Sequence, residues 1–407
     1  MTTRRVASDL RTDLIDWLRA EDVIRTSGVE AAMRRTPRHL FLPGVTLKQA
    51  YADEPVYTKT DACGTSISAA SQPWIVATML EQFDVRPGQR VMGAGAGTGY
   101  NAALLAAIVG DSGRVVTIDV DEDLVDRACK HLAAAGVANV DVLLGDGALG
   151  HAEAAPYDRI IATVGAYETP TAWLEQLAPG GRLVVPLRLR GAASRSIIFE
   201  RYDGGWRDQG SELAVFMPLR GIGDDARRLV PLAPEQDVIL QVHKDQEVDA
   251  AALAGVLETE RSKIWTDVFF PPMEPYEWMD LWLACRLDNA IMRMNVQASA
   301  VQRGAVTPMF RWGAMATTCG GALAYLTTRP ALARPDGSRL YEVGVIGHGP
   351  AGRDLAHHVS EEIRAWNATY RSGSVRFEIP DAPALADPSV GRFVLVRPHH
   401  PITVTWQ

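Results

Sequence analysis

Short apolar strands alternate with helical segments between residues 90 and 190, and this rhythm constrains the fold more than any other feature. Strands are expected at 90–94, 114–119, 140–144, YDRIIATV from residue 157 and RLVVPLRL from residue 182, with helices at about 101–109, 122–135 and TAWLEQLA from residue 171. Such alternation is typical of a parallel sheet covered by helices on both faces. The fold class predicted for this half is therefore α/β, an open, doubly wound, Rossmann-like sheet.

Two domains are expected, because 407 residues exceed what one hydrophobic core usually serves. The stretch FMPLRGIGDDARRLVPLAPEQD breaks the rhythm, so we place a first domain at 1–228, with helical periodicity over 8–33, and a second at 229–407. For the second domain the pattern predicts a smaller α+β unit. Its expected elements are a helix at about 249–258, strands at 321–327, 340–345 and 375–379, and a long helix from 352.

Composition excludes several classes of function. The net charge of -8 lacks the basic footprint of a nucleic-acid-binding protein. The N-terminus does not resemble a signal peptide, and no stretch has the length and purity of a membrane span, so we expect a cytoplasmic protein without a membrane partner. The cysteines lack metal-site spacing, which favours reduced thiols and no bound metal; they are Cys63, Cys129, Cys285 and Cys319.

A glycine loop lies between the first predicted strand and its helix, in VMGAGAGTGY. Gly95, Gly97 and Gly99 leave the backbone bare where a helix N-terminus offers free N–H groups, which suits a nucleotide-like ligand. Reading Gly97, Gly99 and Ala102 instead satisfies the dinucleotide pattern. A tight turn without a ligand is the remaining alternative.

Two acids follow later strands. Asp119 ends the second strand, where an acid receives the ribose hydroxyls of either S-adenosylmethionine or NAD. Asp146 lies in GDG after the third strand, where a methyltransferase typically places an acid near the adenine amino group. A loop-forming Asp-Gly turn is the alternative for Asp146.

The ordered series VMGAGAGTGY, VVTIDVD, LLGDG, YDRIIATVGAYETP and LAPGGRLVVPL resembles the class I S-adenosylmethionine-dependent methyltransferases. Together with PRHLF and SQPWIVATML it looks most like the protein-L-isoaspartate (D-aspartate) O-methyltransferases, over about the first half of the chain. The resemblance implies S-adenosylmethionine as cofactor. The cofactor-binding residues that it implies are Gly93, Gly95, Gly97, Gly99, Asp119, Val120, Asp146, Gly147 and Thr163.

Gly93 departs from the family pattern. The family usually has an acid there that helps to hold the cofactor's amino group, so we expect weaker cofactor binding or a substitute polar group from elsewhere.

Ser71 occupies, by resemblance, the position of the family's active-site serine, whose hydroxyl can hold the acceptor carboxylate. A helix N-cap is its alternative role, and Ser68 is its nearest competitor. We expect Ser68, Gln72 and Val164 to contact the substrate. Methyl transfer to a carboxylate needs alignment more than acid-base help, because an aspartyl side chain is already ionised at neutral pH.

A core of this type followed by a domain ending in RPHHPITVTWQ resembles the C-terminally extended methyltransferases encoded with ribosomally made peptides such as lanthipeptides, including the FxLD-system type. That resemblance implies an aspartate in a modified, macrocyclic precursor peptide as the methyl acceptor, with a succinimide and then isoaspartate as the sequel. We expect the second domain, 229–407, to recognise this peptide. The alternatives are general isoaspartyl repair, a nicotinamide-dependent oxidoreductase, or a non-catalytic peptide-binding protein with a vestigial cofactor fold. The stretch FFPPMEPYEWMDLWLACRLDNAIMRM is either a peptide-binding surface or the core of the second domain.

Overall fold

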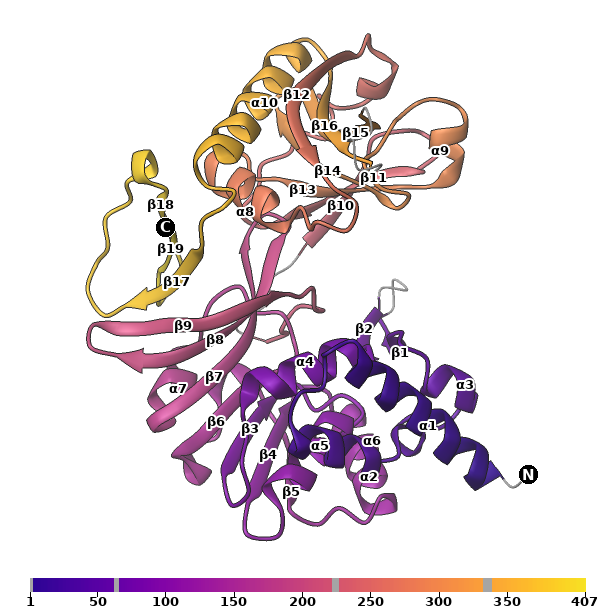
Figure 1. The fold of residues 1–407 in the computed structure, drawn as a ribbon, viewed down its shortest axis with the longest axis vertical. Coiled ribbons are helices and arrows are strands. Elements are labelled where there is room, and N and C mark those ends of the chain that lie inside the picture. Colours follow the sequence, from indigo (N-terminus) through magenta and orange to yellow (C-terminus); the bar gives the residue numbers. More distant parts are fainter. Residues whose placement is uncertain (1–2, 62–65, 222–226, 332–338) are drawn as a thin grey trace.

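A computed structural model describes residues 3–61, 66–221, 227–331 and 339–407, and within these ranges the chain forms two large sheets (Figure 1). The first has ten described strands in the order β18-β19-β17-β9-β8-β7-β6-β3-β4-β5, and the second has seven in the order β10-β11-β13-β14-β15-β16-β12. The first sheet spans the lower part of the molecule in Figure 1, and the second forms an upper lobe.

The first sheet contains the predicted parallel core. Its core strands are β3 (Arg90–Ala94), β4 (Arg114–Asp119), β5 (Val140–Leu144), β6 (Tyr157–Ala162) and β7 (Leu177–Arg190). These strands pair in parallel, and β8 (Ala193–Tyr202) and β9 (Gly205–Leu213) continue the sheet antiparallel. The α/β, Rossmann-like prediction is confirmed, since the parallel strands alternate with α5 (Tyr100–Val109), α6 (Glu122–Ala134) and the short α7 (Thr171–Glu175).

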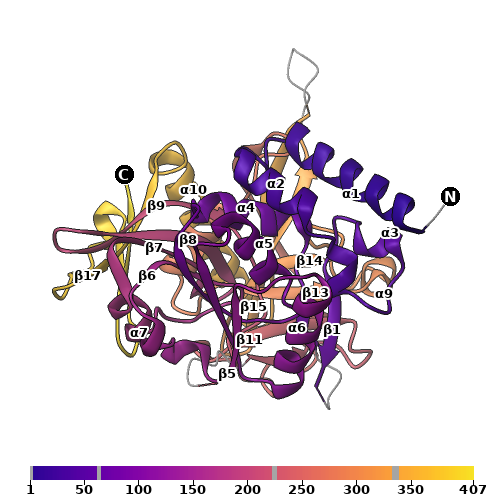
Figure 2. The ribbon, with the colours of Figure 1, turned by 90° about the horizontal axis from the view of Figure 1, so that it is seen from below.

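Successive residues of each core strand face opposite layers. Val91 and Val115 pack with the helices of one layer, whereas Met92 and Val116 belong to a cluster on the other side. The first layer consists of α1 (Thr3–Ala20), α2 (Ser27–Arg35), α4 (Pro73–Phe83) and α5, and Figure 2 shows these helices gathered together.

The helix expected over 8–33 is two helices. Asp22 adopts a left-handed φ of 57°, and the Thr26 side chain accepts a hydrogen bond from the Val29 N–H at the start of α2. A local cap therefore ends the periodic run that the apolar stripe predicts.

The stretch KTDACGTSISAASQP is not only turns. Parts of it belong to β1 (Val56–Thr60) and β2 (Ser66–Ala70), which pair antiparallel, and the Thr58 hydroxyl donates to Ser68 Oγ at 3.0 Å. Two short helices precede this pair, η1 (Arg38–Phe41) and α3 (Leu47–Ala50). Cys63 lies outside the described residues.

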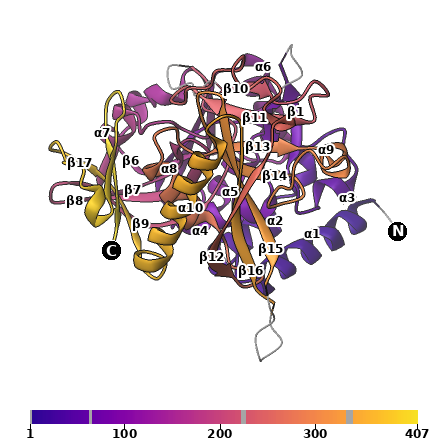
Figure 3. The same cartoon turned by 90° about the horizontal axis from the view of Figure 1, so that it is seen from above.

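The second sheet is antiparallel. Its strands are β10 (Arg227–Pro231), β11 (Val238–His243), β12 (Ser262–Phe270), β13 (Met292–Val296), β14 (Gly313–Cys319), β15 (Ala322–Pro330) and β16 (Tyr341–His348). The long helix α10 (Gly352–Thr369) lies across this sheet (Figure 3), and the short helix α9 (Ala298–Gln302) follows β13.

The helix expected at 249–258 is wrong. The Asp249 carboxylate accepts hydrogen bonds from the Ala251 and Ala252 N–H groups, and Gly255 has a φ of 72°. This local bonding favours turns, so only the short η4 (Val256–Glu258) forms.

The last strands return to the first sheet. They are β17 (Val375–Pro380), β18 (Arg392–Leu395) and β19 (Ile402–Trp406), preceded by η5 (Pro388–Val390). β17 pairs with β9, and Glu378 forms an ion pair with Arg207 at 2.6 Å. Residues 229–407 therefore contribute strands to both sheets.

The helix α8 (Glu277–Arg286) joins the two sheets by packing against the hairpin of β7 and β8. Arg195 forms an ion pair with Glu277 at 3.0 Å, and Arg190 donates to the Cys285 carbonyl. At the hairpin turn, a Cβ on Gly191 would lie 2.1 Å from the Ile291 carbonyl oxygen, so only glycine permits this approach. The buried side chains of α8 confirm the core interpretation for that part of the Met/Trp/Tyr-rich stretch.

Candidate active site

A cavity of about 490 Å³ opens at the carboxyl ends of β3, β4 and β6, where ligands of open α/β sheets gather. It brings together ten of the thirteen predicted site residues, namely Ser68, Ser71, Gln72, Gly95, Gly97, Asp119, Val120, Gly147, Thr163 and Val164. Gly93, Gly99 and Asp146 do not line it.

The glycines of the loop have different tasks. Gly95 has a φ of 96°, and a Cβ there would lie 2.9 Å from Thr163 Oγ1, which donates to the Gly95 carbonyl at 2.8 Å. Gly99 begins α5 and packs against the backbone of Ala128. A Cβ on Gly97 would meet nothing nearer than the Ala69 carbonyl at 4.0 Å, so its bare backbone faces the cavity. Packing thus favours glycine at positions 95 and 99, whereas Gly97 leaves room for a ligand.

Asp119 is fixed beside the glycine loop. Its Oδ2 accepts the Gly97 N–H at 3.0 Å and its Oδ1 accepts the Asp121 N–H at 3.3 Å. The side chain is 8% exposed and faces the cavity at the end of β4. An ionised carboxylate has about four lone-pair sites, so this one can still accept hydroxyls of a ribose.

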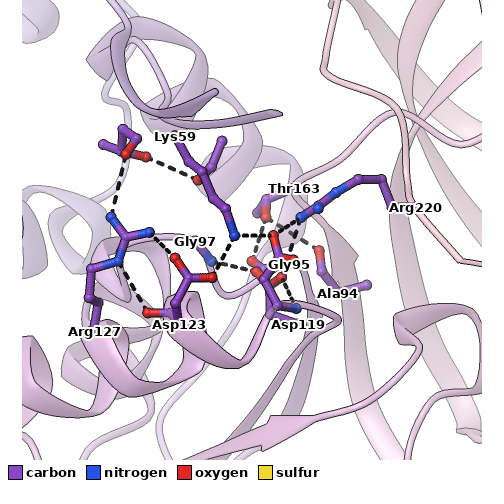
Figure 4. A network of polar contacts seen from close by, with 12 residues as sticks. Lys59, Ala94, Gly95, Gly97, Asp119, Asp123, Arg127, Thr163 and Arg220 are labelled. Atoms are coloured by element: carbon purple, nitrogen blue, oxygen red, sulfur yellow. Dashed lines mark hydrogen bonds and ion pairs between the residues drawn. The ribbon is translucent and has the colours of Figure 1, made fainter. Parts of the chain in front are cut away.

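Basic side chains from two distant segments converge on this end of β4 (Figure 4). Arg220 lies 2.5 Å from Asp121 and 3.8 Å from Asp119, while Lys59 lies 3.2 Å from Asp121 and 2.5 Å from Asp123. Burial acts to raise the pKa of Asp121, but hydrogen bonds from Arg220 and Lys59 outweigh it and hold that pKa below its usual value. The Asp121 carboxylate is thus ionised, and it is held by Arg220 and Lys59 from two different segments of the chain.

Sequence reasoning missed Lys59, Asp121 and Arg220. Asp121 has a signal, since it follows Asp119 by two residues in IDVD. Lys59 and Arg220 have none, because each arrives from a segment read as a turn-rich stretch or a domain boundary.

The segment 213–220 forms one wall of the cavity and bonds to the loop after β6. The Gly165 N–H donates to the Met217 carbonyl at 2.7 Å, and the Leu219 N–H donates to the Gly165 carbonyl at 2.7 Å. The chain that leads toward the second sheet therefore closes the site beside Thr163 and Val164.

Asp146 and Gly93 lie beside the cavity without lining it. The Asp146 carboxylate accepts the Ala148 N–H at 2.9 Å, as the Asp-Gly turn alternative predicts, and Gly147 rather than Asp146 faces the cavity. Gly93 is buried in β3, where a Cβ would lie 3.4 Å from Thr117 Oγ1. The adenine role of Asp146 and the cofactor role of Gly93 stay predictions.

Ser71 and Gln72 form the opposite wall. The N-cap of α4 is Gln72, and the Asp53 carboxylate accepts the Trp74 N–H at 2.8 Å, so the N-cap alternative for Ser71 is wrong. The Ser71 hydroxyl makes no hydrogen bond to any residue that the structure describes, whereas Ser68 Oγ accepts from Thr58. Ser71 therefore keeps its donor and both lone pairs for a ligand, whereas Ser68 uses one lone pair for Thr58.

Within the described ranges, no group of three or more His, Cys, Asp or Glu side chains is placed to hold a metal ion. Among those same residues, no helix has the length and apolarity needed to cross a membrane.

Comparison with known proteins finds relatives for the first half of the chain. Residues 9–222 match the family model described as protein-L-isoaspartate(D-aspartate) O-methyltransferase (PCMT). The protein-L-isoaspartate O-methyltransferase of Methanopyrus kandleri is 39% identical over 212 residues, which are 52% of this chain and 91% of the relative. That of Pyrococcus horikoshii is 40% identical over 208 residues, 51% of this chain and 91% of the relative.

A solved structure named protein-L-isoaspartate O-methyltransferase aligns with 91% of this chain and 96% of its own, with a TM-score of 0.50 and 21% identity. That likeness concerns the fold, and it extends beyond the family-matched half. The glycine loop and the acid at the end of β4 both line the cavity, and both lie within the residues that match the family model. The chain belongs to the protein-L-isoaspartate(D-aspartate) O-methyltransferase family and is an S-adenosylmethionine-dependent protein carboxyl O-methyltransferase.

Proposed function

We propose that the protein methylates an aspartate or isoaspartate carboxylate of a peptide in this cavity. The cofactor would bind along one wall and the acceptor along the other. One observation carries the proposal: the same cavity is lined by Gly97 and Asp119 on one side and by Ser71 and Gln72 on the other. S-adenosylmethionine supplies an electrophilic methyl group on a sulfonium. Asp119 would accept its ribose hydroxyls, and the backbone at Gly95 and Gly97 would lie against its methionine part.

The chain's own residues then orient the acceptor. The Ser71 hydroxyl donates a hydrogen bond to one carboxylate oxygen, and the other oxygen is left free to attack. Gln72 is fixed by its side-chain amide, which donates to Asp53 at 2.7 Å. Alignment of this kind supplies a large part of the rate in a reaction that needs no general base.

For the substrate, we infer an aspartate in a ribosomally made, modified precursor peptide of the macrocyclic lanthipeptide kind. Support comes from the resemblance of the residues beyond the family match, which end in RPHHPITVTWQ, to methyltransferases encoded with such peptides; these residues build a second sheet and extend the first. The methyl ester replaces a poor leaving group by methanol, so the next backbone amide can close a succinimide, which opens to isoaspartate.

General repair of isoaspartate is the second candidate function. The curated relatives carry the name of the isoaspartate enzyme, and the solved structure of that name shares the fold over most of this chain. A C-terminal extension is thus compatible with either substrate and does not separate them.

A competition experiment distinguishes the two. The full chain is incubated with S-adenosylmethionine and equimolar amounts of a linear isoaspartyl peptide and a thioether-cyclised peptide with a normal aspartate in the ring, and methyl ester formation is followed by mass spectrometry. Preferential methylation of the cyclic aspartate supports the precursor-peptide proposal. Preferential methylation of the linear isoaspartyl peptide supports repair, and methylation of neither contradicts both.

A further inference from the structure

The PRHLF stretch places one arginine directly behind the acceptor wall. Arg38 is 1% exposed, and its guanidinium donates to three backbone carbonyls. The acceptors are Ala50 at 3.0 Å, Ala70 at 3.4 Å and Ser71 at 2.9 Å. Ala50 ends α3, whereas Ala70 and Ser71 lie at the start of the acceptor wall. The Arg38 side chain therefore connects these two segments.

This arginine is buried without an acid at ion-pair distance among the described residues. Its Nη1 is buried and has no hydrogen-bond partner, and its Cζ lies 5.2 Å from the centre of the Tyr100 ring. Burial lowers the pKa of the Arg38 guanidinium, and the nearby Tyr100 and Asp53 offset only part of that effect. Burying an unpaired charge lowers the stability of the fold. Its presence here is therefore best explained by a task in the function of the site.

Asp53 holds the other side of the same segment. Its Oδ2 accepts the Gln72 side-chain amide at 2.7 Å and its Oδ1 accepts the Trp74 N–H at 2.8 Å. Gln72 and Trp74 flank the first residue of α4, so Asp53 caps this helix from a different part of the chain.

We propose that Arg38 and Asp53 are positioning residues for methyl transfer: they fix Ser71 and Gln72 from behind so that the free Ser71 hydroxyl meets the acceptor carboxylate in line with the methyl donor. The inference rests on the proposed function. It assigns a task to the PRHLF stretch, whose residues do not line the cavity.

Arginine suits this task better than lysine. Its planar fork presents several N–H groups in a fixed geometry, so one side chain can hold carbonyls from two segments at once, whereas an ammonium group is a single point donor on a flexible stem. Lysine at position 38 would keep the charge and lose the geometry.

Arg159 is a matched control at the opposite end of the same helix. It is 9% exposed and donates to the carbonyls of Phe83 at 3.0 Å and Asp84 at 3.3 Å, just where α4 ends. Arg159 therefore resembles Arg38 in burial and in bonding to backbone carbonyls, but it acts far from the acceptor wall.

The experiment compares R38M, R38K and R159M in the full chain. Cofactor dissociation constants, melting temperatures, kcat and KM for whichever peptide the wild type methylates are measured well below the lowest melting temperature. We expect R38M to lower kcat about 100-fold and R38K about 10-fold, with cofactor affinity within about threefold of wild type. R159M should lose comparable thermal stability and keep kcat within about threefold.

Equal kcat values for R38M and R159M would overturn the inference, as would parallel losses of cofactor binding and turnover in R38M. If R38M does not fold, R38K decides by the same criteria. D53A should lower kcat as R38M does, and D53N should recover part of it, because Asn keeps an acceptor for the Trp74 N–H. An inactive wild type would contradict the proposed function itself, whereas an active wild type with unaffected variants contradicts only the positioning role.

Discussion

The two sheets use their polar residues in different ways. At the carboxyl ends of β3, β4 and β6, polar groups from separate segments face one cavity. In the second sheet, charged side chains pair with one another: Arg303 with Asp237, and Arg329 with Glu342 at 2.6 Å. Parallel strands bring their carboxyl ends to one edge and so gather a site, whereas antiparallel strands spread their ends over two edges. The described residues that line the cavity thus all come from the first 220 positions, and the second sheet contributes none of them.

Asp119 offers the largest test of this contrast. D119A should weaken S-adenosylmethionine binding about 100-fold, because it removes the charged acceptor for two ribose hydroxyls. Isothermal titration checks the affinity. D141N is the control, since Asp141 is an exposed acid of the neighbouring strand that pairs with Arg114; it should bind the cofactor like wild type. A D119A chain that binds within threefold of wild type would contradict the site.

The two serines separate turnover from binding. S71A should lower kcat about 30-fold with unchanged cofactor affinity, because one hydrogen bond to the reacting carboxylate is lost. S68A should have a smaller effect, since that side chain is buried and its oxygen already accepts from Thr58. Steady-state kinetics of both variants decide the assignment, and a larger loss in S68A would reverse it.

Arg220 tests whether the segment between the sheets takes part in cofactor binding. R220M should weaken cofactor affinity about 10-fold, because it leaves Asp121 and Asp119 with fewer partners and loosens the cavity wall. The loss should be smaller at high salt, where the wild-type ion pairs are already screened. R228M removes an exposed arginine just beyond this segment and serves as the control. Identical cofactor affinities for R220M and R228M would show that Arg220 and its segment have no role in cofactor binding.

Asp280 of α8 should affect stability and not turnover. Burial, and then the charge of Glu277, raise its pKa to about 7. Because the folded pKa lies above the unfolded value of 3.8, its contribution favours folding at low pH and is lost as the pH rises from about 4 to 7. D280N should remove this slope and stabilise the protein at pH 8 by about 1–2 kcal/mol, as thermal or urea unfolding would show.

The opposite sign is expected at Asp237, whose pKa is lowered by its hydrogen bond to Arg303. D237N should therefore destabilise the protein at pH 8. An unchanged pH slope in D280N would show that Asp280 is solvated.

Local pattern was enough to predict the parallel core. Strand β4 begins and ends where the apolar run predicts, because its residues after Arg114 are buried on both faces and read as an almost continuous apolar run. The second sheet was harder to predict. Its strands pair across long distances, and the return of β17 to β9 depends on contacts between residues some 170 positions apart, such as Glu378 with Arg207. No local pattern encodes that pairing.

The site divides in the same way. Gly97, Asp119 and Ser71 could be predicted, since the first two follow strands of a regular sheet and the third has a family motif around it. Arg38, Asp53 and Arg220 could not be assigned their contacts, because each reaches the site from a loop or a short helix whose position is set by tertiary packing. Asp146 stays an untested prediction, since one of its carboxylate oxygens accepts the Ala148 N–H and this bond does not decide what else the carboxylate binds.

A crystal structure of the full chain with S-adenosylhomocysteine and an isoaspartyl peptide tests the central claim most directly. The account predicts ribose hydroxyls on Asp119, the homocysteine part against Gly95 and Gly97, and the acceptor carboxylate within hydrogen-bond distance of the Ser71 hydroxyl. An acceptor carboxylate bound away from Ser71, or a ribose that does not touch Asp119, would contradict it.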